Sequence, residues 1–125
     1  MVDSPSYTDN GDGTVTDNGT ALVWQQAMPT ATYTQTAGLA YCAGLSLGGY
    51  TDWRLPSYVE LLSIVDFSAY DPSINATVFP GTPASFFWSS TPYAGASGGA
   101  WYVAFFDGNA ISNVVSQTYY VRCVR

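Results

Sequence analysis

Of its 125 residues, nine are acidic and three are Arg, whereas Lys and His are absent, so the chain carries a formal net charge of −6. The negative charge excludes nucleic acids, heparin-like polyanions and acidic membranes as partners, because each requires a basic patch on the protein. Without His, Ser-His and Cys-His nucleophilic pairs are impossible, and the commonest zinc ligand is lacking. A chain of this length closes one hydrophobic core, and we expect a single domain over residues 1–125. No apolar run approaches the ~20 residues of a membrane helix, so no membrane insertion is expected.

The first residues, Met1 to Pro5, lack both the basic start and the apolar stretch of a signal peptide. We therefore expect that an upstream segment was removed or that the domain belongs to a larger chain or a particle. The polar, glycine-rich segment 7–14 then leads to two short β-prone runs, 14–17 and 21–25, on either side of Asn18-Gly19. Asn-Gly between two such runs is a strong hairpin signal, which predicts a β-hairpin here.

The acidic segment Asp9 to Gly13 is a candidate Ca²⁺ site, because hard cations bind clustered oxygen ligands. Aligned to an EF-hand, however, it places Thr8 at the first position and Gly19 at the last, where carboxylates are required. Turns rich in Asp, Asn and Gly are common without any metal. We interpret the segment as such a turn, with an ion in the Asp9–Asp17 loop as the alternative.

Two helices are predicted in the middle of the chain. From Thr34 to Leu47 the β-branched residues thin out and apolar residues recur four apart, until Gly48-Gly49 ends the pattern. The second helix has a clearer start, since Ser57 and Glu60 have the spacing of a capping box and an apolar face follows. The next stretch, 66–87, is long, irregular and rich in proline, which is typical of a functional or omega-like loop.

The last third of the chain is rich in strands. Strands are predicted at 101–106, 111–116 and 119–124. In the first of them, alternation places Tyr102, Ala104 and Phe106 on one face and their apolar neighbours on the other. Asp107-Gly108 is typical of a turn.

The face that carries Tyr102 is expected to be exposed and to bind a partner. Between Tyr102 and Tyr119 the sequence mixes Tyr, Phe, Asn, Asp, Ser and Gln with small residues, as recognition surfaces do. An ordinary solvent-facing sheet surface is the alternative, but exposed Phe106 and Tyr119 favour binding. The expected ligand-binding residues are Tyr93, Tyr102, Ala104, Phe106, Asp107, Asn109, Ala110, Ile111, Ser112, Asn113, Val115, Ser116 and Tyr119. We expect no catalytic residue and no cofactor.

The two cysteines, Cys42 and Cys123, lie in the first predicted helix and the last predicted strand. They are either two free buried thiols or a disulfide, and we favour the disulfide. Such a bridge would close a loop of roughly 80 residues, contribute on the order of 4 kcal/mol and indicate an oxidising compartment.

The arginines of this acidic chain are expected to be structural rather than ligand-binding. We expect Arg54 and Arg122 to pair with carboxylates such as Asp52, Glu60 or Asp66 and to hold segments of the chain together. No glycine-rich phosphate-binding loop of a known type is present.

Five segments resemble a known bacterial family in sequence and in order. They are Asp9–Asn18, Leu22–Gln25, Leu47–Pro56, Phe87–Thr91 and Tyr120–Arg125. These segments are similar to the DUF1566 domain, the type found at the C-terminus of the Legionella collagen-like adhesin. The resemblance spans nearly the whole chain, and the motifs are long enough to be specific.

This resemblance implies an α+β, C-type-lectin-like fold, of the variety shared with formylglycine-generating enzymes. Two helices would pack on a small, twisted, mostly antiparallel sheet, and a disulfide would join a helix to the last strand, as Cys42 and Cys123 could do. Catalytic members of the wider fold use a reactive cysteine pair, whereas both cysteines here are assigned to the bridge. The resemblance thus implies a non-catalytic binding domain that is extracellular, on the cell surface or on a virion, with a protein or glycan partner.

Two binding roles are compatible with the resemblance. The first is a fixed surface adhesin; the collagen-like relative recognises sulfated glycosaminoglycans, but a chain without Lys does not support that specificity. The second is the variable protein of a diversity-generating retroelement, which randomises a C-terminal strip and keeps a framework. The framework would be Trp101, Val103, Phe105, Gly108 and Tyr120 to Arg125. The strip, whose residues all have codons of the type NNC, would be Ala104, Phe106, Asp107, Ala110 to Val115, Ser116, Thr118 and Tyr119. Gln117 has no such codon.

Two other classes of function are open alternatives. One is an enzyme, such as a hydrolase built on Asp66, Asp71 or Asp107, which would need two close carboxylates in a deep pocket. The other is a structural module whose C-terminal face is buried against another chain. Light scattering would separate such an oligomer from a domain with a free binding face.

Overall fold

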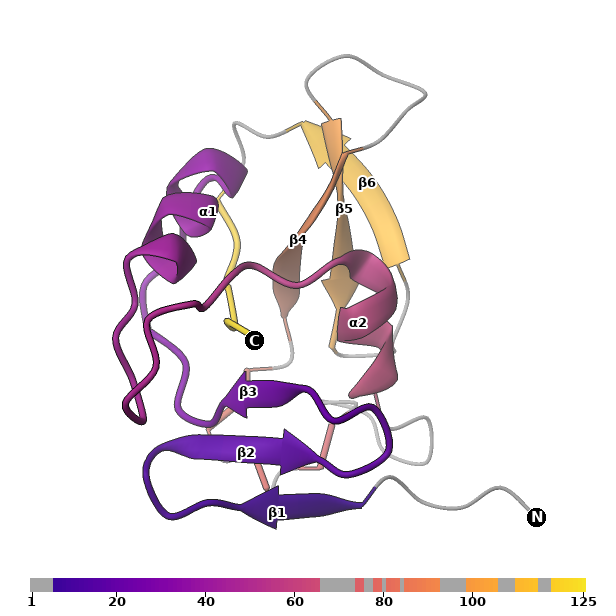
Figure 1. The fold of residues 1–125 in the computed structure, drawn as a ribbon. Helices are drawn as coiled ribbons and strands as arrows, with labels where there is room; N and C mark the ends of the chain where they lie inside the picture. Colours follow the sequence, from indigo (N-terminus) through magenta and orange to yellow (C-terminus); the bar gives the residue numbers. More distant parts are fainter. Residues whose placement is uncertain are drawn as a thin grey trace, which may run out of the picture.

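The described residues form a small α+β domain with two helices, two antiparallel sheets and one disulfide (Figure 1). The structure is a computed structural model that describes residues 6–65, 74–75, 78–79, 81–83, 85–92, 99–105, 110–114 and 118–125. Its elements are β1 (Tyr7–Asp9), β2 (Thr14–Asp17), β3 (Val23–Gln25), α1 (Gln35–Ala43), α2 (Tyr58–Ser63), β4 (Phe86–Pro92), β5 (Gly99–Ala104) and β6 (Ala110–Val114). The predicted α+β class is confirmed, but the strands form two three-stranded sheets rather than one.

The first sheet is an antiparallel meander in the order β1-β2-β3. The predicted hairpin is confirmed, since β2 pairs with β3 and Thr14 lies opposite Gln25. Strand β1 was not expected from the sequence, because its segment is polar and lacks an apolar alternation. Hydrogen bonds hold its end: the Asn10 amide, just after β1, donates to the Thr14 hydroxyl at 2.9 Å and to the Thr16 hydroxyl at 3.0 Å. The Tyr7 ring of β1 also packs edge-on against the Phe79 ring, with the centroids 5.4 Å apart.

The second sheet has the order β4-β5-β6, and both of its strand pairs are antiparallel. Its pairing is regular except for a register shift between Trp88 and Pro92 on β4. The predicted returning strand, 111–116, is present as β6 at 110–114. Within this three-stranded order, β6 is an outer strand.

The C-terminal segment, residues 119–125, joins the two sheets. The Tyr120 amide donates to Phe86 O at 3.0 Å on β4. A few residues later, the Gln25 amide of β3 donates to Cys123 O at 3.0 Å and the Val23 amide to Arg125 O at 2.9 Å. Figure 1 shows this segment in yellow, passing between α1 and β4 toward β3. One short segment therefore fixes how the two sheets are placed.

Helix α1 begins where the sequence predicts and ends earlier. The Thr34 hydroxyl accepts a hydrogen bond from the Ala37 amide at 3.2 Å, which caps the helix. Gly44 is the C-cap, with φ of −95° and ψ of 0°, and the next amide, Leu45 N, bonds to Cys42 O at 3.1 Å instead of continuing the helical pattern. Gly48 and Gly49, which were expected to stop the helix, instead form a separate turn with φ of 63° and 83°.

The predicted disulfide is present and links Cys42 of α1 to Cys123, with a Cα–Cα distance of 5.4 Å. Gly38, one turn earlier on α1, packs against the same C-terminal segment. A Cβ atom built on Gly38 would lie 2.7 Å from Val121 Cγ1, which is closer than real carbon atoms approach. Glycine at this position lets α1 lie close enough for the bridge.

We predict that Gly38→Ala lowers the free energy of unfolding by about 1–3 kcal/mol, because the added methyl overpacks the contact with Val121. Intrinsic helix propensity alone would favour Ala by up to about 1 kcal/mol. Urea denaturation should show this loss, whereas Gly44→Ala, with φ of −95° and a Cβ 3.4 Å from Ala40 O, should be nearly neutral. In a double-mutant cycle, Val121→Ala should relieve part of the loss. Equal stability of Gly38→Ala and the unmodified protein would contradict this packing.

Helix α2 is held by the predicted capping box. The Ser57 hydroxyl accepts from the Glu60 amide at 3.2 Å, and the Glu60 carboxylate accepts from the Ser57 amide at 2.9 Å. The same carboxylate accepts a hydrogen bond from each terminal nitrogen of Arg54, at 2.6 and 2.7 Å. These bonds lower the pKa of Glu60, with Arg54 as the largest cause. A helix of only six residues is thereby fixed at its start.

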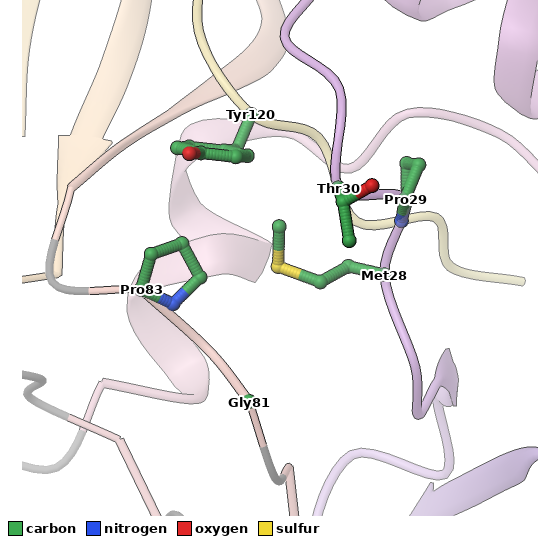
Figure 2. A pocket seen from close by; sticks show the side chains of 6 residues that line it. All are labelled: Met28, Pro29, Thr30, Gly81, Pro83 and Tyr120. Carbon is green, nitrogen blue, oxygen red and sulfur yellow. The ribbon is translucent and has the colours of Figure 1, made fainter.

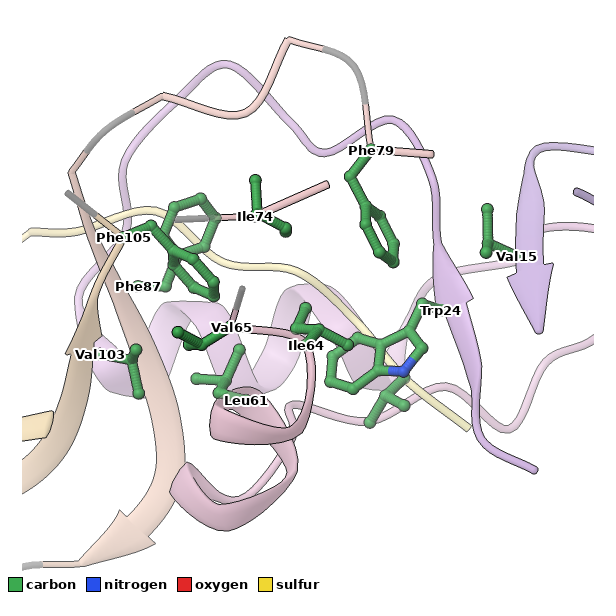
Figure 3. Close-up of a cluster of buried hydrophobic side chains, with 11 residues drawn as sticks. Val15, Trp24, Leu61, Ile64, Val65, Ile74, Phe79, Phe87, Val103 and Phe105 are labelled. Carbon is green, nitrogen blue, oxygen red and sulfur yellow. The ribbon is translucent and has the colours of Figure 1, made fainter. Parts of the chain in front are cut away.

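Two clusters of buried side chains lie on opposite faces of the second sheet. Figure 3 shows the first, where Leu61 and Ile64 of the α2 region meet Phe87, Val103 and other side chains of the sheets and loops. The second contains the disulfide, Trp53, Leu55, Trp88, Ala100, Tyr102 and Val121. Both faces of β5 are therefore covered. No helix in the described part of the chain is long and apolar enough to span a membrane.

Candidate binding surface

Four aromatic side chains meet on the face of the second sheet that carries the second cluster. This aromatic cluster consists of Phe86, Trp88, Tyr102 and Tyr119. The centroid of the Tyr119 ring lies 4.8 Å from that of Trp88, 4.9 Å from Tyr102 and 5.2 Å from Phe86. Tilted and edge-on ring pairs at such distances contribute about 0.5–1.5 kcal/mol each beyond their burial. Tyr119 is therefore fixed by three neighbouring rings.

Exposure increases from the base of the aromatic cluster to its rim. Trp88 is fully buried and Tyr102 is 7% exposed, whereas Phe86 and Tyr119 are half-buried. Burial, followed by the neighbouring Tyr119 hydroxyl, raises the pKa of Tyr102, so this phenol stays neutral at physiological pH. The cluster thus presents the half-buried rings of Phe86 and Tyr119 on a buried base.

The expectation that Tyr102 and Ala104 stand on an exposed face is wrong, since both are buried. Tyr102 packs in the second cluster with Val121 and the disulfide. The other face of β5, with Val103, packs on the first cluster. Alternation in the sequence identifies two faces, but it does not reveal that segments distant in the chain cover both. Tyr102 and Ala104 support the surface from beneath.

Two further tyrosines, Tyr33 and Tyr41, adjoin the cluster, and neither was expected from the sequence to belong to a site. Tyr33 exchanges two backbone hydrogen bonds with Tyr119, of 2.7 and 2.8 Å, and its ring stacks on that of Tyr41 at 5.3 Å. The Trp88 indole donates to Tyr33 O at 2.9 Å. Tyr33 and Tyr41 are half-buried and pack on the same core cluster as Phe86. We call Tyr33, Tyr41, Phe86 and Tyr119 the aromatic surface.

The remaining expected site residues divide into two groups. Ala110, Ile111, Ser112 and Asn113 lie on β6, where Ile111 is the register partner of Tyr102. This pairing brings the predicted strip next to the strand that supports the aromatic cluster. The positions outside the described residues are Tyr93, Phe106, Asp107, Asn109, Val115 and Ser116.

Two of the three arginines are held in surface ion pairs. Arg54 pairs with Glu60 as expected. Asp52 pairs with Arg125 instead, whose terminal nitrogen lies 2.9 Å from the carboxylate and whose guanidinium carbon lies 3.7 Å from the Tyr50 ring centroid. The hydrogen bond from Arg125 lowers the pKa of Asp52. Both guanidinium groups are therefore paired with a carboxylate.

Arg122 is 1% exposed and forms a different kind of contact from the expected carboxylate pair. Within the described residues its bonds go to neutral groups: Nη1 donates to Gln25 O and Gln26 O, both at 2.6 Å, and Nη2 donates to the Thr82 hydroxyl at 2.7 Å. Its guanidinium also lies 4.8 Å from the Phe79 ring centroid. Burial lowers the pKa of Arg122 to about 9, so it is still a cation at neutral pH. Arg122 therefore acts as a clamp: its buried charge joins the C-terminal segment to residues 25–26 and to Thr82 by hydrogen bonds.

The acidic segment before β2 forms a tight turn by its own hydrogen bonds. One oxygen of Asp9 accepts from the Gly11 amide at 3.0 Å, and one of Asp12 accepts from the Thr14 amide at 3.0 Å. Gly11 and Gly13 have φ of 77° and 90°, which explains the glycines. Across the described ranges, no three His, Cys, Asp or Glu side chains gather as potential metal ligands.

The carboxylates that were considered for a hydrolase, Asp66, Asp71 and Asp107, lie outside the described residues. Both cysteines, the other candidate nucleophiles, are joined in the disulfide. The candidate site among the described residues is therefore the aromatic surface, which lies beside the outer strand β6.

A comparison with curated proteins finds no significant match. A comparison with protein families does, and the matching family is described as the Lcl C-terminal domain, of the Legionella collagen-like protein family. The match covers residues 13–125, from the end of the acidic turn through both helices and both disulfide cysteines to the last residue. It therefore includes every residue of the aromatic surface. On this match, the chain belongs to the Lcl C-terminal domain family.

Proposed function

We propose that the domain is a non-catalytic, surface-displayed binding domain whose aromatic surface, with β6 beside it, contacts an uncharged protein or glycan partner. The observation that carries this proposal is the half-buried Tyr119, which is held by three rings yet reaches the surface. Tyr and Trp are enriched among the residues that dominate binding energy. A ring that is already immobile loses little conformational entropy when a partner binds.

The charge distribution narrows the class of partner. Polyanions such as sulfated glycans require free Lys or Arg side chains. Arg54 and Arg125 are engaged in ion pairs, Arg122 is buried, and the chain has no Lys. We therefore propose a neutral partner, either a protein patch or a neutral glycan, for the aromatic surface.

A surface location is consistent with the family and with the disulfide. The family is that of a collagen-like adhesin, and disulfides persist in oxidising compartments. We propose an extracellular, cell-surface or virion-associated position. The non-catalytic character rests on the lack of His and on the commitment of both cysteines to the bridge.

The variable protein of a diversity-generating retroelement is our second candidate. It is favoured by the position of strip residues 110–114 on β6, an outer strand of the three-stranded order. Substitutions at the rim of a sheet disturb packing less than substitutions in its core. The buried Ala104 would then belong to the framework instead of the strip. A near-copy of the 3′ end of the gene, differing at adenines and lying beside a reverse transcriptase gene, would support this candidate, and its absence would favour the fixed adhesin.

We predict that Tyr119→Ala reduces the affinity for the partner by at least about tenfold, as expected for a central aromatic anchor. The partner would first be identified with glycan arrays and protein libraries, and the affinity then measured by calorimetry. Val59→Ala is the matched control, because Val59 is 61% exposed on α2, away from the aromatic surface. Thermal unfolding should show that both variants remain folded. Unchanged affinity for a folded Tyr119→Ala protein would exclude the aromatic surface as the binding site.

A further inference from the structure

A small pocket opens between residues 28–30, residues 81–83 and Tyr120. It is separate from the aromatic surface. Figure 2 shows its lining, with the Met28 side chain reaching between Pro83, Tyr120 and Thr30. The lining residues are Met28, Pro29, Thr30, Gly81, Pro83 and Tyr120, and the volume is about 150 Å³. Thr30 and Gly81 are exposed, so the pocket opens to solvent. Tyr120 packs on the first core cluster and Tyr119 on the second, which separates this pocket from the aromatic surface.

The chemistry of the walls selects an uncharged occupant. None of the six lining side chains is charged. An anion would find no cation among them, in a chain of net charge −6. A cation would likewise find no carboxylate among the lining side chains. A neutral group is favoured, because its transfer from water into this uncharged pocket costs little free energy.

The size of the pocket limits the occupant to one small group. Sites for free, drug-sized ligands are usually about 300–1,000 Å³, well above this volume. A cavity of about 150 Å³ can hold a benzene ring. The walls also favour a ring over an aliphatic chain, because thioethers and tyrosines make favourable contacts with aromatic rings. The Met28 sulfur and the Tyr120 ring supply such contacts.

We propose that this pocket receives a single aromatic side chain of a protein partner. It is a second contact point, distinct from the aromatic surface, and it would act as an anchor pocket of the kind that dominates many interfaces. The pocket and its occupant can be tested with a capped amino acid, without knowing the partner.

The two methionines of the chain, Met1 and Met28, make a direct test possible. With methyl-¹³C methionine, the Met28 methyl signal reports on the pocket and the Met1 signal serves as an internal reference. N-acetyl-phenylalaninamide should shift the Met28 signal saturably, through the ring current of the bound phenyl group, with a millimolar Kd. N-acetyl-lysinamide, a cation, and the α-amide of N-acetyl-aspartic acid, an anion, should bind at least tenfold more weakly.

Thr30→Trp should fill the mouth of the pocket and weaken binding of the phenylalanine probe at least tenfold. Thr32→Trp is the matched control, since Thr32 is also exposed in the same segment but does not line the pocket. Thermal unfolding would verify that both variants are folded. The proposal is overturned by an unsaturable Met28 shift, by equal responses to the lysine and phenylalanine probes, or by equal effects of the two variants. None of these results depends on the aromatic surface.

Discussion

Replacing both Cys42 and Cys123 by Ala is expected to lower the free energy of unfolding by about 4 kcal/mol. The bridge spans a sequence separation of 81 residues, and in the chain-entropy model a cross-link of this span restricts the unfolded chain strongly. Both residues are fully buried, so the loss of their packing acts in the same direction. Urea denaturation of the unmodified and the double-Ala protein would measure the difference.

Reduction provides the control for this prediction. Dithiothreitol should destabilise the unmodified protein to a similar extent and leave the double-Ala variant unchanged. Domains of this size have a total stability of about 5–15 kcal/mol, so the loss would remove a large share of it. If the unmodified protein were equally stable with and without reductant, the bridge would not be a main source of stability, and the argument for an oxidising compartment would weaken.

Arg122→Ala is expected to cost about 3 kcal/mol or more, although it removes a buried charge. The guanidinium is the donor to Gln25 O and Gln26 O, and its loss leaves these carbonyls without that partner and opens a cavity beside Phe79. Removal of one partner of a buried polar contact generally lowers the stability far more than removal of one partner of an exposed contact.

The contrast between two arginines tests this clamp. Arg125 is also a cation of the C-terminal segment, but its ion pair with Asp52 is on the surface, where such pairs contribute about 0–1 kcal/mol. Arg125→Ala should therefore be nearly neutral in urea denaturation. Arg122→Lys should not restore stability, because one ammonium cannot reproduce the fork that reaches three acceptors. Similar losses for Arg122→Ala and Arg125→Ala would show that burial of Arg122 is not important.

Features with a local chemical signature could be predicted from the sequence. The hairpin follows from Asn18-Gly19 between two β-prone runs, and the start of α2 follows from Ser57 and Glu60. The disulfide was one of two open interpretations of two distant cysteines, and the structure contains it. In each of these cases the deciding contacts involve residues of characteristic chemistry at a recognisable spacing.

What could not be predicted depends on contacts between distant segments. Tyr102 and Ala104 are buried because the second core cluster covers their face of β5, and no alternation within one strand can show this. Tyr33 could not be assigned to the aromatic surface for the same reason, because its backbone hydrogen bonds to the distant Tyr119 place it there. Arg122 was expected near a carboxylate, but two of its three acceptors are backbone carbonyls, which every residue has, and they lie 96 and 97 residues earlier in the chain.

The C-terminal segment also sets the order of events during synthesis. Its contacts reach back as far as Val23, which exchanges backbone hydrogen bonds with Arg125, so the junction of the two sheets cannot form until residues 119–125 have left the ribosome. The disulfide between Cys42 and Cys123 likewise cannot form until Cys123 has been synthesised. A nascent chain in this state still lacks its closing contacts, and contacts of such high sequence separation form slowly. The junction of the two sheets and the Cys42–Cys123 bridge therefore both form only after the last residues of the domain have been synthesised.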